Sequence, residues 1–219
     1  MKITFENVSS LEGIRNLDLE LDLSHVTVLY DPSEILSHAI LNAIVGLDEL
    51  WDGQILVDGI PHWQYLDQEP QARSFGYVFD EGIMLSNLSL KENLMLPLRW
   101  LNPDLDEGET QKMIDSWMQR FDLNLDLSQR PVVYRPGELK LLSFVRTLMI
   151  APKALLIDDP YYMLNKTERQ KLYRILCNLK NSNPMLIASI DDDFGSGFAD
   201  EIIDLSGKQG NLVSVASLS

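Results

Sequence analysis

The stretch VTVLYDPSEILSHAILNAIVGL, residues 26–47, decides the fold class. Its first five residues favour a buried strand. After a short polar loop at 31–33, apolar residues recur at helical spacing from Ile35 to Leu47, and Ser33 is a good residue for the N-cap of that helix. A strand, a tight loop and an amphipathic helix form the usual frame of a phosphate-binding loop.

Strands and helices alternate along the rest of the chain. Residues 154–160 (ALLIDDP) and 184–190 (PMLIASI) predict further buried strands, and a helical segment lies between them. Residues 86–150 are mainly helical in pattern, and 201–218 are typical of a terminal hairpin. This order predicts an α/β fold around a parallel sheet.

Composition excludes several classes of function. The net charge of −15 argues against nucleic acid or anionic lipid as a direct ligand, because both are polyanions. No apolar run is long enough to insert into a membrane. The one cysteine cannot form an internal disulfide, which fits a reducing compartment, and none of the three histidines has metal-ligand spacing.

Four segments, in order, resemble the nucleotide-binding subunit of ABC transporters. They are DPSEILSHAILNAIVGL, GYVFDEGIMLSNLSLKENLMLPL, YRPGELKLLSFVRTLMIAPKALLIDDP and ASIDDDFGSGFADEIIDL, which are similar to the Walker A loop, the Q-loop region, the signature with Walker B, and the switch region. The ENLMLPL form is most similar to single-domain importer and lipid-trafficking subunits. Four correctly spaced elements are strong evidence for a fold and do not by themselves give an activity.

The resemblance implies an ABC-type P-loop NTPase fold. We expect a mixed sheet core with an N-terminal antiparallel β part, built from residues 1–85 and 151–219. We expect residues 86–150 to form an inserted helical subdomain that carries the signature.

The Walker A loop departs from the family pattern at every position that would meet phosphate. Its glycine positions hold Asp31, Glu34 and Leu36, and its lysine position holds Ser37. The serine or threonine that would meet magnesium is His38, and Ala39 follows it.

Relative to the family, the loop gains three negative units of charge. Three such changes about 4 Å from a triphosphate oppose binding by roughly 3–12 kcal/mol, depending on the dielectric. We therefore expect no cofactor; ATP with magnesium would be needed only if the chain were an active ATPase with unusual motifs.

The helix after the loop still needs its first N–H groups satisfied. We hypothesise that oxygens of Asp31, Ser33 and Glu34 take the place of phosphate and keep the loop folded. The alternative is drift, in which a loop released from nucleotide binding collects polar residues.

The other motifs of the resemblance are also altered. Asp80 replaces the Q-loop glutamine, and Arg135 and Pro136 replace the signature serine and first glycine, of which only Gly137 remains. Ile190 replaces the switch histidine, and isoleucine cannot polarise a water molecule.

Two aspartates follow the Walker B strand. Asp158 matches the aspartate linked to magnesium and is the one candidate metal ligand, while Asp159 replaces the catalytic glutamate with a side chain one methylene shorter. Both can equally be structural, since an aspartate at a strand end often caps a neighbouring loop. We expect no competent catalytic residue.

The surface for a membrane partner looks less altered. In the family, the segment after the Q-loop receives a helix of the permease, and here it holds a run of apolar residues: Phe79, Ile83, Met84, Leu85 and Leu88. The same residues can equally belong to the core of the helical subdomain.

Three functions remain open from the sequence. The favoured one is an ABC-type subunit that does not bind or hydrolyse ATP normally and acts as a scaffold or regulator for a permease or a sister ABC subunit, with a homodimer as one arrangement. The second is an active transporter ATPase, and the third is a soluble interaction protein outside a transporter. The expected location is cytoplasmic, or peripheral at the inner face of a membrane.

Overall fold

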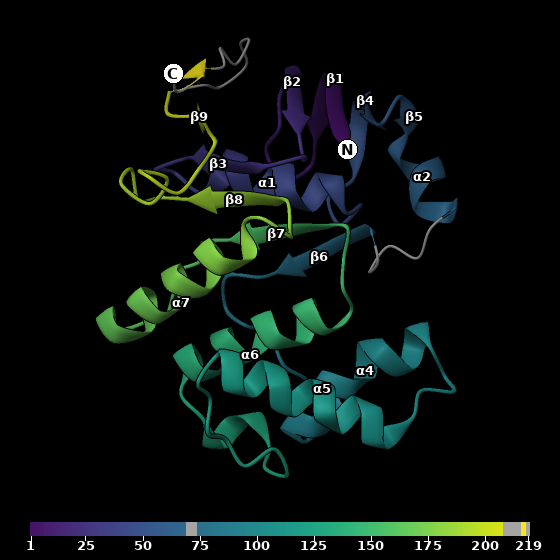
Figure 1. The fold of residues 1–219 in the computed structure, drawn as a ribbon. Coiled ribbons are helices and arrows are strands. Elements are labelled where there is room, and N and C mark those ends of the chain that lie inside the picture. The colour runs from purple at the N-terminus through teal and green to yellow at the C-terminus, as the bar shows by residue number, and fades with distance from the viewer. Residues whose placement is uncertain (69–73, 208–215, 218–219) are drawn as a thin grey trace.

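The computed structural model describes residues 1–68, 74–207 and 216–217. Two sheets organise the chain (Figure 1). The first is a four-stranded antiparallel sheet in the order β2-β1-β4-β5; its strands are β1 (Lys2–Ser10), β2 (Leu17–Asp22), β4 (Leu50–Val57) and β5 (Ile60–Pro61). In β2 the residues alternate between buried and exposed, as a sheet with one wet face requires.

The second sheet is mixed, in the order β10-β9-β3-β8-β7-β6. Its strands are β3 (Val26–Tyr30), β6 (Phe75–Val78), β7 (Ala154–Asp158), β8 (Met185–Ser189), β9 (Glu201–Asp204) and β10 (Ala216–Ser217). All neighbours are parallel except β9 and β10. Every residue of β7 and β8 is buried, because these central strands are covered on both faces.

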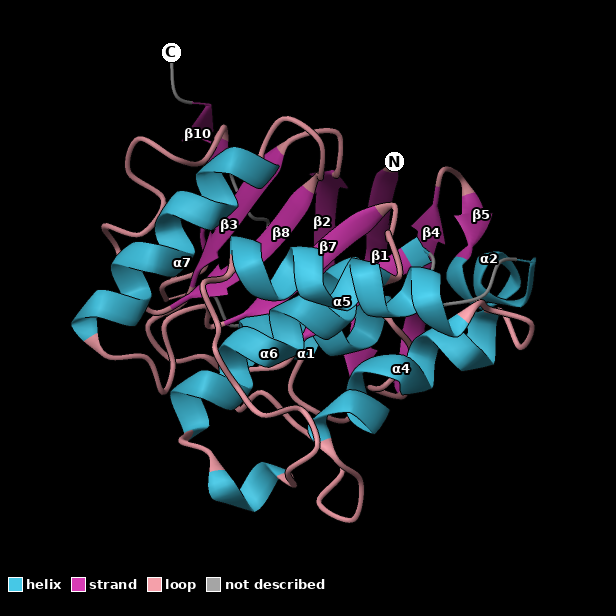
Figure 2. Ribbon diagram, turned by 60° about the horizontal axis from the view of Figure 1, so that its bottom comes forward, coloured by secondary structure: helices cyan, strands magenta, loops and turns pink. Residues whose placement is uncertain are grey.

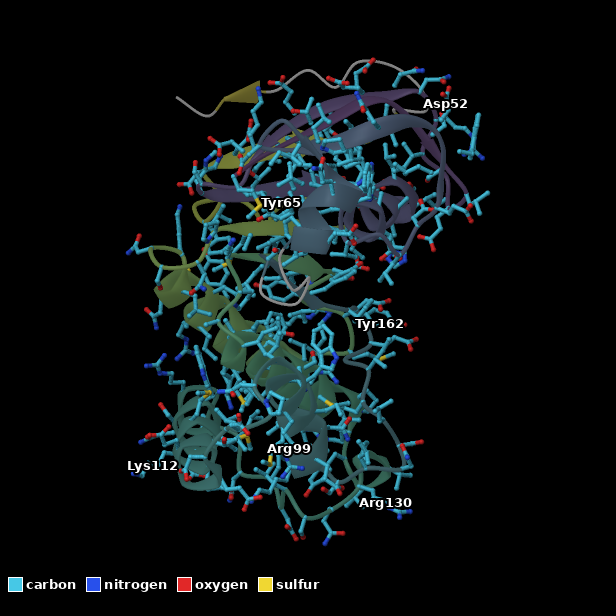
Figure 3. The ribbon with its side chains drawn as sticks, turned by 90° about the vertical axis from the view of Figure 1, so that its right-hand side faces the viewer. Asp52, Tyr65, Arg99, Lys112, Arg130 and Tyr162 are labelled. Atoms are coloured by element: carbon cyan, nitrogen blue, oxygen red, sulfur yellow. The ribbon has the colours of Figure 1, made fainter. Side chains whose placement is uncertain are left out.

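Helices cover both faces of the second sheet, and one short helix lies against the first sheet. They are α1 (Ile35–Ile44), α2 (His62–Gln68), α4 (Leu90–Leu101), α5 (Glu107–Arg120), α6 (Pro136–Met149) and α7 (Lys166–Leu179), with a short 3₁₀ turn η1 (Pro131–Val133). Figure 2 shows α7 at one side of the molecule and α4, α5 and α6 gathered beside one another. In Figure 3, Asp52 marks the antiparallel-sheet end of the molecule and Arg130 the helical end.

Two apolar clusters hold these layers together. One joins the antiparallel sheet, α1 and one face of the second sheet. The other joins the opposite face of that sheet to α4, α5, α6 and α7. The expected fold class is confirmed: antiparallel and parallel sheets combine with a block of helices between β6 and β7.

Two sequence expectations reach the limits of this description. The terminal hairpin is present as the antiparallel pair β9 and β10, while its predicted turn falls at 208–215, outside the described residues. The division into 1–85 with 151–219 and 86–150 stays a prediction. Among the residues described, no helix has the length and apolar character needed to span a bilayer.

Candidate functional site

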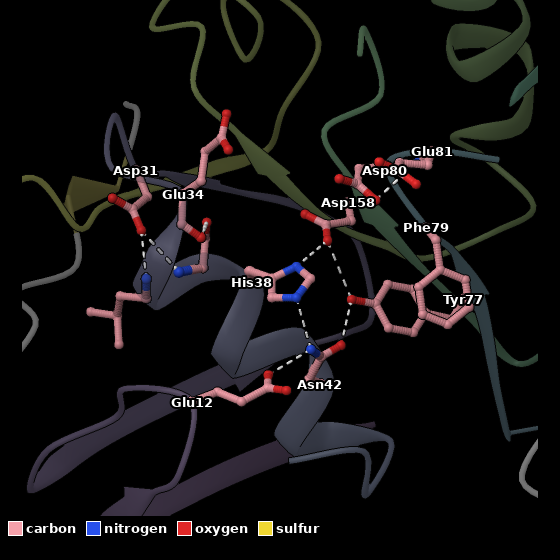
Figure 4. Close-up of polar contacts among 12 residues, drawn as sticks. Glu12, Asp31, Glu34, His38, Asn42, Tyr77, Phe79, Asp80, Glu81 and Asp158 are labelled. Atoms are coloured by element: carbon pink, nitrogen blue, oxygen red, sulfur yellow. Dashed lines mark hydrogen bonds and ion pairs between the residues drawn. The ribbon is translucent and has the colours of Figure 1, made fainter. Parts of the chain in front are cut away.

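The loop between β3 and α1 is closed by the carboxylate of Asp31. Asp31 Oδ2 accepts hydrogen bonds from the backbone N–H groups of Leu36 at 2.9 Å and Ser37 at 3.0 Å. Asp31 Oδ1 accepts from the backbone N–H of Ser33 at 2.9 Å and from its hydroxyl at 2.6 Å. Asp31 is 2% exposed. The first amides of α1 are therefore satisfied by an internal anion (Figure 4).

The other two residues expected to satisfy α1 do not do so. Ser33 is not the N-cap: its hydroxyl donates to Asp31 instead of accepting from the helix. The cap position is Glu34, in a left-handed conformation with φ of 62° and no side-chain capping bond. Asp31 reaches the amides from further back in the chain, which leaves Ser33 without a capping role and lets the exposed Glu34 face the pocket.

His38 is tied to the Walker B aspartate. The His38 Nδ1 and Asp158 Oδ2 atoms lie 2.5 Å apart. Asn42 donates one amide hydrogen to Glu12 at 2.7 Å, so its other hydrogen points to His38 Nε2 at 2.9 Å. His38 Nε2 is thus an acceptor, and Nδ1 carries the proton donated to Asp158. The Tyr77 hydroxyl donates to Asn42 Oδ1 at 2.8 Å and extends this network (Figure 4).

A buried lysine that the sequence analysis missed lies beneath the site. Lys140 of α6 is 0% exposed, and its Nζ donates to the carbonyl oxygens of Phe79 at 2.8 Å and Asp158 at 2.9 Å. Burial lowers the pKa of Lys140 to about 8, and the nearby carboxylates, Asp159 first, oppose that shift. A lysine within the apolar run LKLLSFV was the available signal.

A cavity of about 460 Å³ that is rich in carboxylates opens beside the loop and is lined by His38 and Asp158. Its acidic lining residues are Glu12, Glu34, Asp80, Asp158 and Asp159. Burial raises the pKa of Glu34, with a further contribution from Asp159. Burial likewise raises the pKa of Asp159, although its backbone contact with Tyr161 and the Lys140 ammonium lower it. The site is therefore already crowded with negative charge before any ligand enters.

Ile190, at the switch position, lines the same cavity and is 44% exposed. Asp159 Oδ1 accepts from the backbone N–H of Tyr161 at 3.1 Å, a local turn contact of the kind expected from a structural aspartate. Asp80 accepts from the next backbone N–H, of Glu81, at 2.7 Å. The structure thus brings Asp80, Asp158 and Ile190 together at the Walker loop.

The signature positions lie outside this cavity. Arg135 Nη2 donates to Glu168 Oε1 of α7 at 2.9 Å, and Pro136 opens α6, where its missing N–H costs nothing. A Cβ at Gly137 would lie 2.7 Å from Glu168 Oε2 and 2.9 Å from the Met163 carbonyl oxygen. Close packing against the start of α7 explains why a glycine is needed there.

Two further cavities, of about 270 and 460 Å³, form an apolar groove beside β6 and α4. They share Pro97 and Arg146, and their lining also includes Leu47, Phe79, Leu96 and Trp100. Of the five residues expected here, Phe79 lines the groove, Ile83 and Leu85 are exposed, Leu88 is half-buried, and Met84 packs against the core with its Sδ 3.6 Å from Arg146 Nη1. Sequence reasoning missed Leu96 and Trp100, whose helical spacing of four residues was the available signal.

No group of three or more histidine, cysteine, aspartate or glutamate residues is arranged to hold a metal ion in the described part of the chain. The carboxylate of Asp158, the expected candidate ligand, is engaged by His38. The metal role of Asp158 stays a prediction.

Comparison with known proteins defines the class. Residues 38–162 match the family model described as ABC transporter, and this is more than half of the chain. The chain belongs to the ABC transporter family.

Individual relatives agree with that assignment. The chain is 29% identical over 84% of its length to the molybdenum import ATP-binding protein ModC of Rhodobacter capsulatus, covering 50% of that protein. It is 26% identical over 92% of its length to the glutamine transport ATP-binding protein GlnQ of Escherichia coli, covering 86% of it. The chain therefore spans about half the length of the ModC relative and most of GlnQ.

A solved structure shares the whole fold. The ATP-binding cassette MJ0796, in a dimeric post-hydrolysis state bound to ADP and Pi, superposes with a TM-score of 0.82 at 20% identity and with 99% of each chain covered.

These comparisons correct the expectation that the chain takes no cofactor. The relatives are ATP-binding proteins, and the MJ0796 cassette holds ADP and Pi. ATP with magnesium is the cofactor that membership of this family implies, so the expectation of none is wrong.

The loop nonetheless does not fit a phosphate in the conformation described. The amides of Leu36 and Ser37 are already bound by Asp31, and no lysine is among the described residues that line the cavity. A phosphate could take these amides only by displacing the Asp31 carboxylate.

Proposed function

We propose that this chain is the ATP-binding-type subunit of an importer-class ABC transporter that does not hydrolyse ATP at its own site. In this proposal it acts as a scaffold or regulator for a membrane permease or a sister ABC subunit. The observation that carries the proposal is the Asp31 carboxylate bound to the Leu36 and Ser37 amides. Nucleotide remains the ligand implied by the family, and the proposal concerns turnover.

Two further contacts and one side chain support loss of hydrolysis. His38 and Asp158 are hydrogen-bonded to each other, which engages both side chains that the family resemblance assigns to magnesium. Asp159 Oδ1 accepts from Tyr161 in a local turn, which engages one oxygen of the carboxylate that would have to orient a water. Ile190 offers no polar atom at the switch position.

An assay of phosphate release tests this proposal. The purified chain is given MgATP beside a variant with a restored loop: Asp31→Gly, Glu34→Gly, Leu36→Gly, Ser37→Lys and His38→Ser. We expect no release above the protein-free blank from the wild type. We expect the restored loop to bind labelled ATP more tightly and still to release no phosphate, because Asp159 and Ile190 are unchanged. Release by the wild type that disappears in Asp158→Asn would show an active ATPase, the alternative that the relatives favour.

The partner in this proposal docks in the apolar groove beside α4. The groove has exposed apolar side chains, among them Trp100, which is 69% exposed, and Leu96, which is 48% exposed. Such a surface is unfavourable when it is left in water. Co-purification of a membrane protein in mild detergent with the wild type, and its loss in Leu96→Glu/Trp100→Glu, is the expected result. Trp63→Glu is the matched control, since Trp63 is 63% exposed on α2 and lines no part of the groove. Recovery of no membrane protein would favour a soluble interaction protein.

A further inference from the structure

Positive charge in this acidic protein is concentrated on one helix. The chain carries 33 acidic and 18 basic residues, whereas α7 (Lys166–Leu179) carries four basic residues and one acidic residue. The helix therefore has a net charge of +3, and the remaining residues together have −18.

The one carboxylate of α7 does not offset its exposed cations. Glu168 is buried, where its Oε1 accepts from Arg135 at 2.9 Å and its Oε2 accepts from the Asn165 backbone N–H at 2.9 Å. Lys171 is the basic residue that is paired, with Asp122 at 2.9 Å.

The other three cations, Lys166, Arg169 and Arg174, are exposed, and none forms an ion pair with a carboxylate of the described residues. Figures 1 and 2 place α7 at the edge of the molecule with its outer side uncovered.

These cations surround a hollow of about 650 Å³, which we call the α7 hollow. It is lined by Tyr161, Lys166, Arg169, Gln170, Tyr173 and Arg174. Lys166, Gln170 and Arg174 repeat every four residues and so share one face of the helix.

Two contacts hold the α7 hollow in shape. Arg169 Nε donates to the Leu164 carbonyl oxygen at 3.0 Å, and the guanidinium carbon lies 5.4 Å from the centre of the Tyr161 ring. Tyr161 in turn packs edge-on against Phe194, with ring centres 4.9 Å apart. The guanidinium is thus positioned before any ligand arrives, and its terminal N–H groups remain available, which lowers the entropy cost of binding an anion.

The charge distribution decides which kind of anion fits. A long polyanion such as nucleic acid, or an anionic membrane, meets the field of the −18 remainder. A short acidic peptide extends little beyond the α7 hollow. At physiological salt, the negative charges of the protein that lie more than about 8 Å from the peptide are largely screened. We propose that the α7 hollow binds a short acidic segment of a partner protein, with carboxylates on Lys166, Arg169 and Arg174 and an apolar contact on Tyr161. This inference does not depend on whether the chain hydrolyses ATP.

Fluorescence anisotropy with a labelled hexaglutamate peptide tests the proposal on the full chain. The test variant is Lys166→Ser/Arg169→Ser/Arg174→Ser. The matched control removes three exposed cations elsewhere, Lys91→Ser/Lys112→Ser/Arg130→Ser, two of which are labelled on the helical end in Figure 3. Thermal unfolding of each variant shows that it is folded.

We expect hexaglutamate to bind the wild type, to bind the α7 variant about tenfold more weakly, and to bind the control within about twofold of wild type. Equal loss in the control, no binding to the wild type, or tighter binding of a 20-nucleotide single strand would overturn the proposal. Amide hydrogen exchange adds a second measurement: the peptide should slow exchange at Tyr161 in the wild type, and unchanged exchange there would also overturn the proposal.

Discussion

Removing the Asp31 carboxylate should destabilise the fold measurably. In Asp31→Ala, four donors lose their acceptor: the N–H groups of Ser33, Leu36 and Ser37 and the Ser33 hydroxyl. A hydrogen bond to a charged group contributes about 1.5–3 kcal/mol, and loss of a helix cap costs about 0.5–2 kcal/mol.

The four contacts are not additive, because they share one carboxylate and the adjoining cavity admits water to the freed amides. We expect a loss of about 2–4 kcal/mol in the free energy of unfolding. For a chain of this size that corresponds to a fall of roughly 5–15 °C in Tm.

Circular dichroism during thermal unfolding measures the effect, and the chain offers a matched control. Asp126 makes the same type of contact, accepting from the Ser128 backbone N–H at 3.0 Å and its hydroxyl at 2.7 Å, on an exposed surface. Asp126→Ala should shift Tm by about 2 °C or less. Asp31→Asn should lie between wild type and Asp31→Ala, since its amide keeps one acceptor but turns an NH₂ toward Ser33. An Asp31→Ala protein that unfolds within about 1 °C of wild type, or no more easily than Asp126→Ala, would refute the reasoning.

Two other predictions follow from particular side chains. Gly82→Ala should lower the free energy of unfolding by more than about 2 kcal/mol, because the new Cβ would lie 2.5 Å from Lys140 Cα at a φ of +62°. The control Gly59→Ala, at a φ of +80° with nothing within 4 Å, should cost about 1 kcal/mol. Equal losses for the two variants in urea titrations would exclude the clash. Burial lowers the pKa of His62, so below pH 6.5 the unfolded chain binds a proton more readily than the folded chain does. The free energy of unfolding should therefore fall more steeply below pH 6.5 in the wild type than in His62→Gln. Parallel plots of unfolding free energy against pH for the two proteins would contradict the shift.

The fold could be predicted because its signals are local and repeated. The change from the strand 26–30 to the helical spacing after Ile35, and the apolar run 154–158, have few other structural solutions. The start of α7 is also encoded locally, because Asn165 and Glu168 have the spacing of a capping box and form one, with Asn165 Oδ1 accepting from the Glu168 N–H at 3.1 Å.

The site could be predicted only in part. The sequence predicted that side-chain oxygens satisfy the first amides of the helix after the loop, but it did not distinguish Asp31 from Ser33 and Glu34, and only the backbone geometry selects Asp31. The Lys140 contacts join α6 to the ends of β6 and β7, residues 61 and 18 positions away, which no local pattern encodes.

The most direct test of the account follows the backbone amides of Leu36 and Ser37 by NMR while MgATP is added to the wild type and to Asp31→Gly. The account predicts that in the wild type any nucleotide that binds leaves both signals in place, because Asp31 holds these amides, and that both signals shift in the variant. Saturable shifts of both amides in the wild type would show phosphate in the loop and contradict the account.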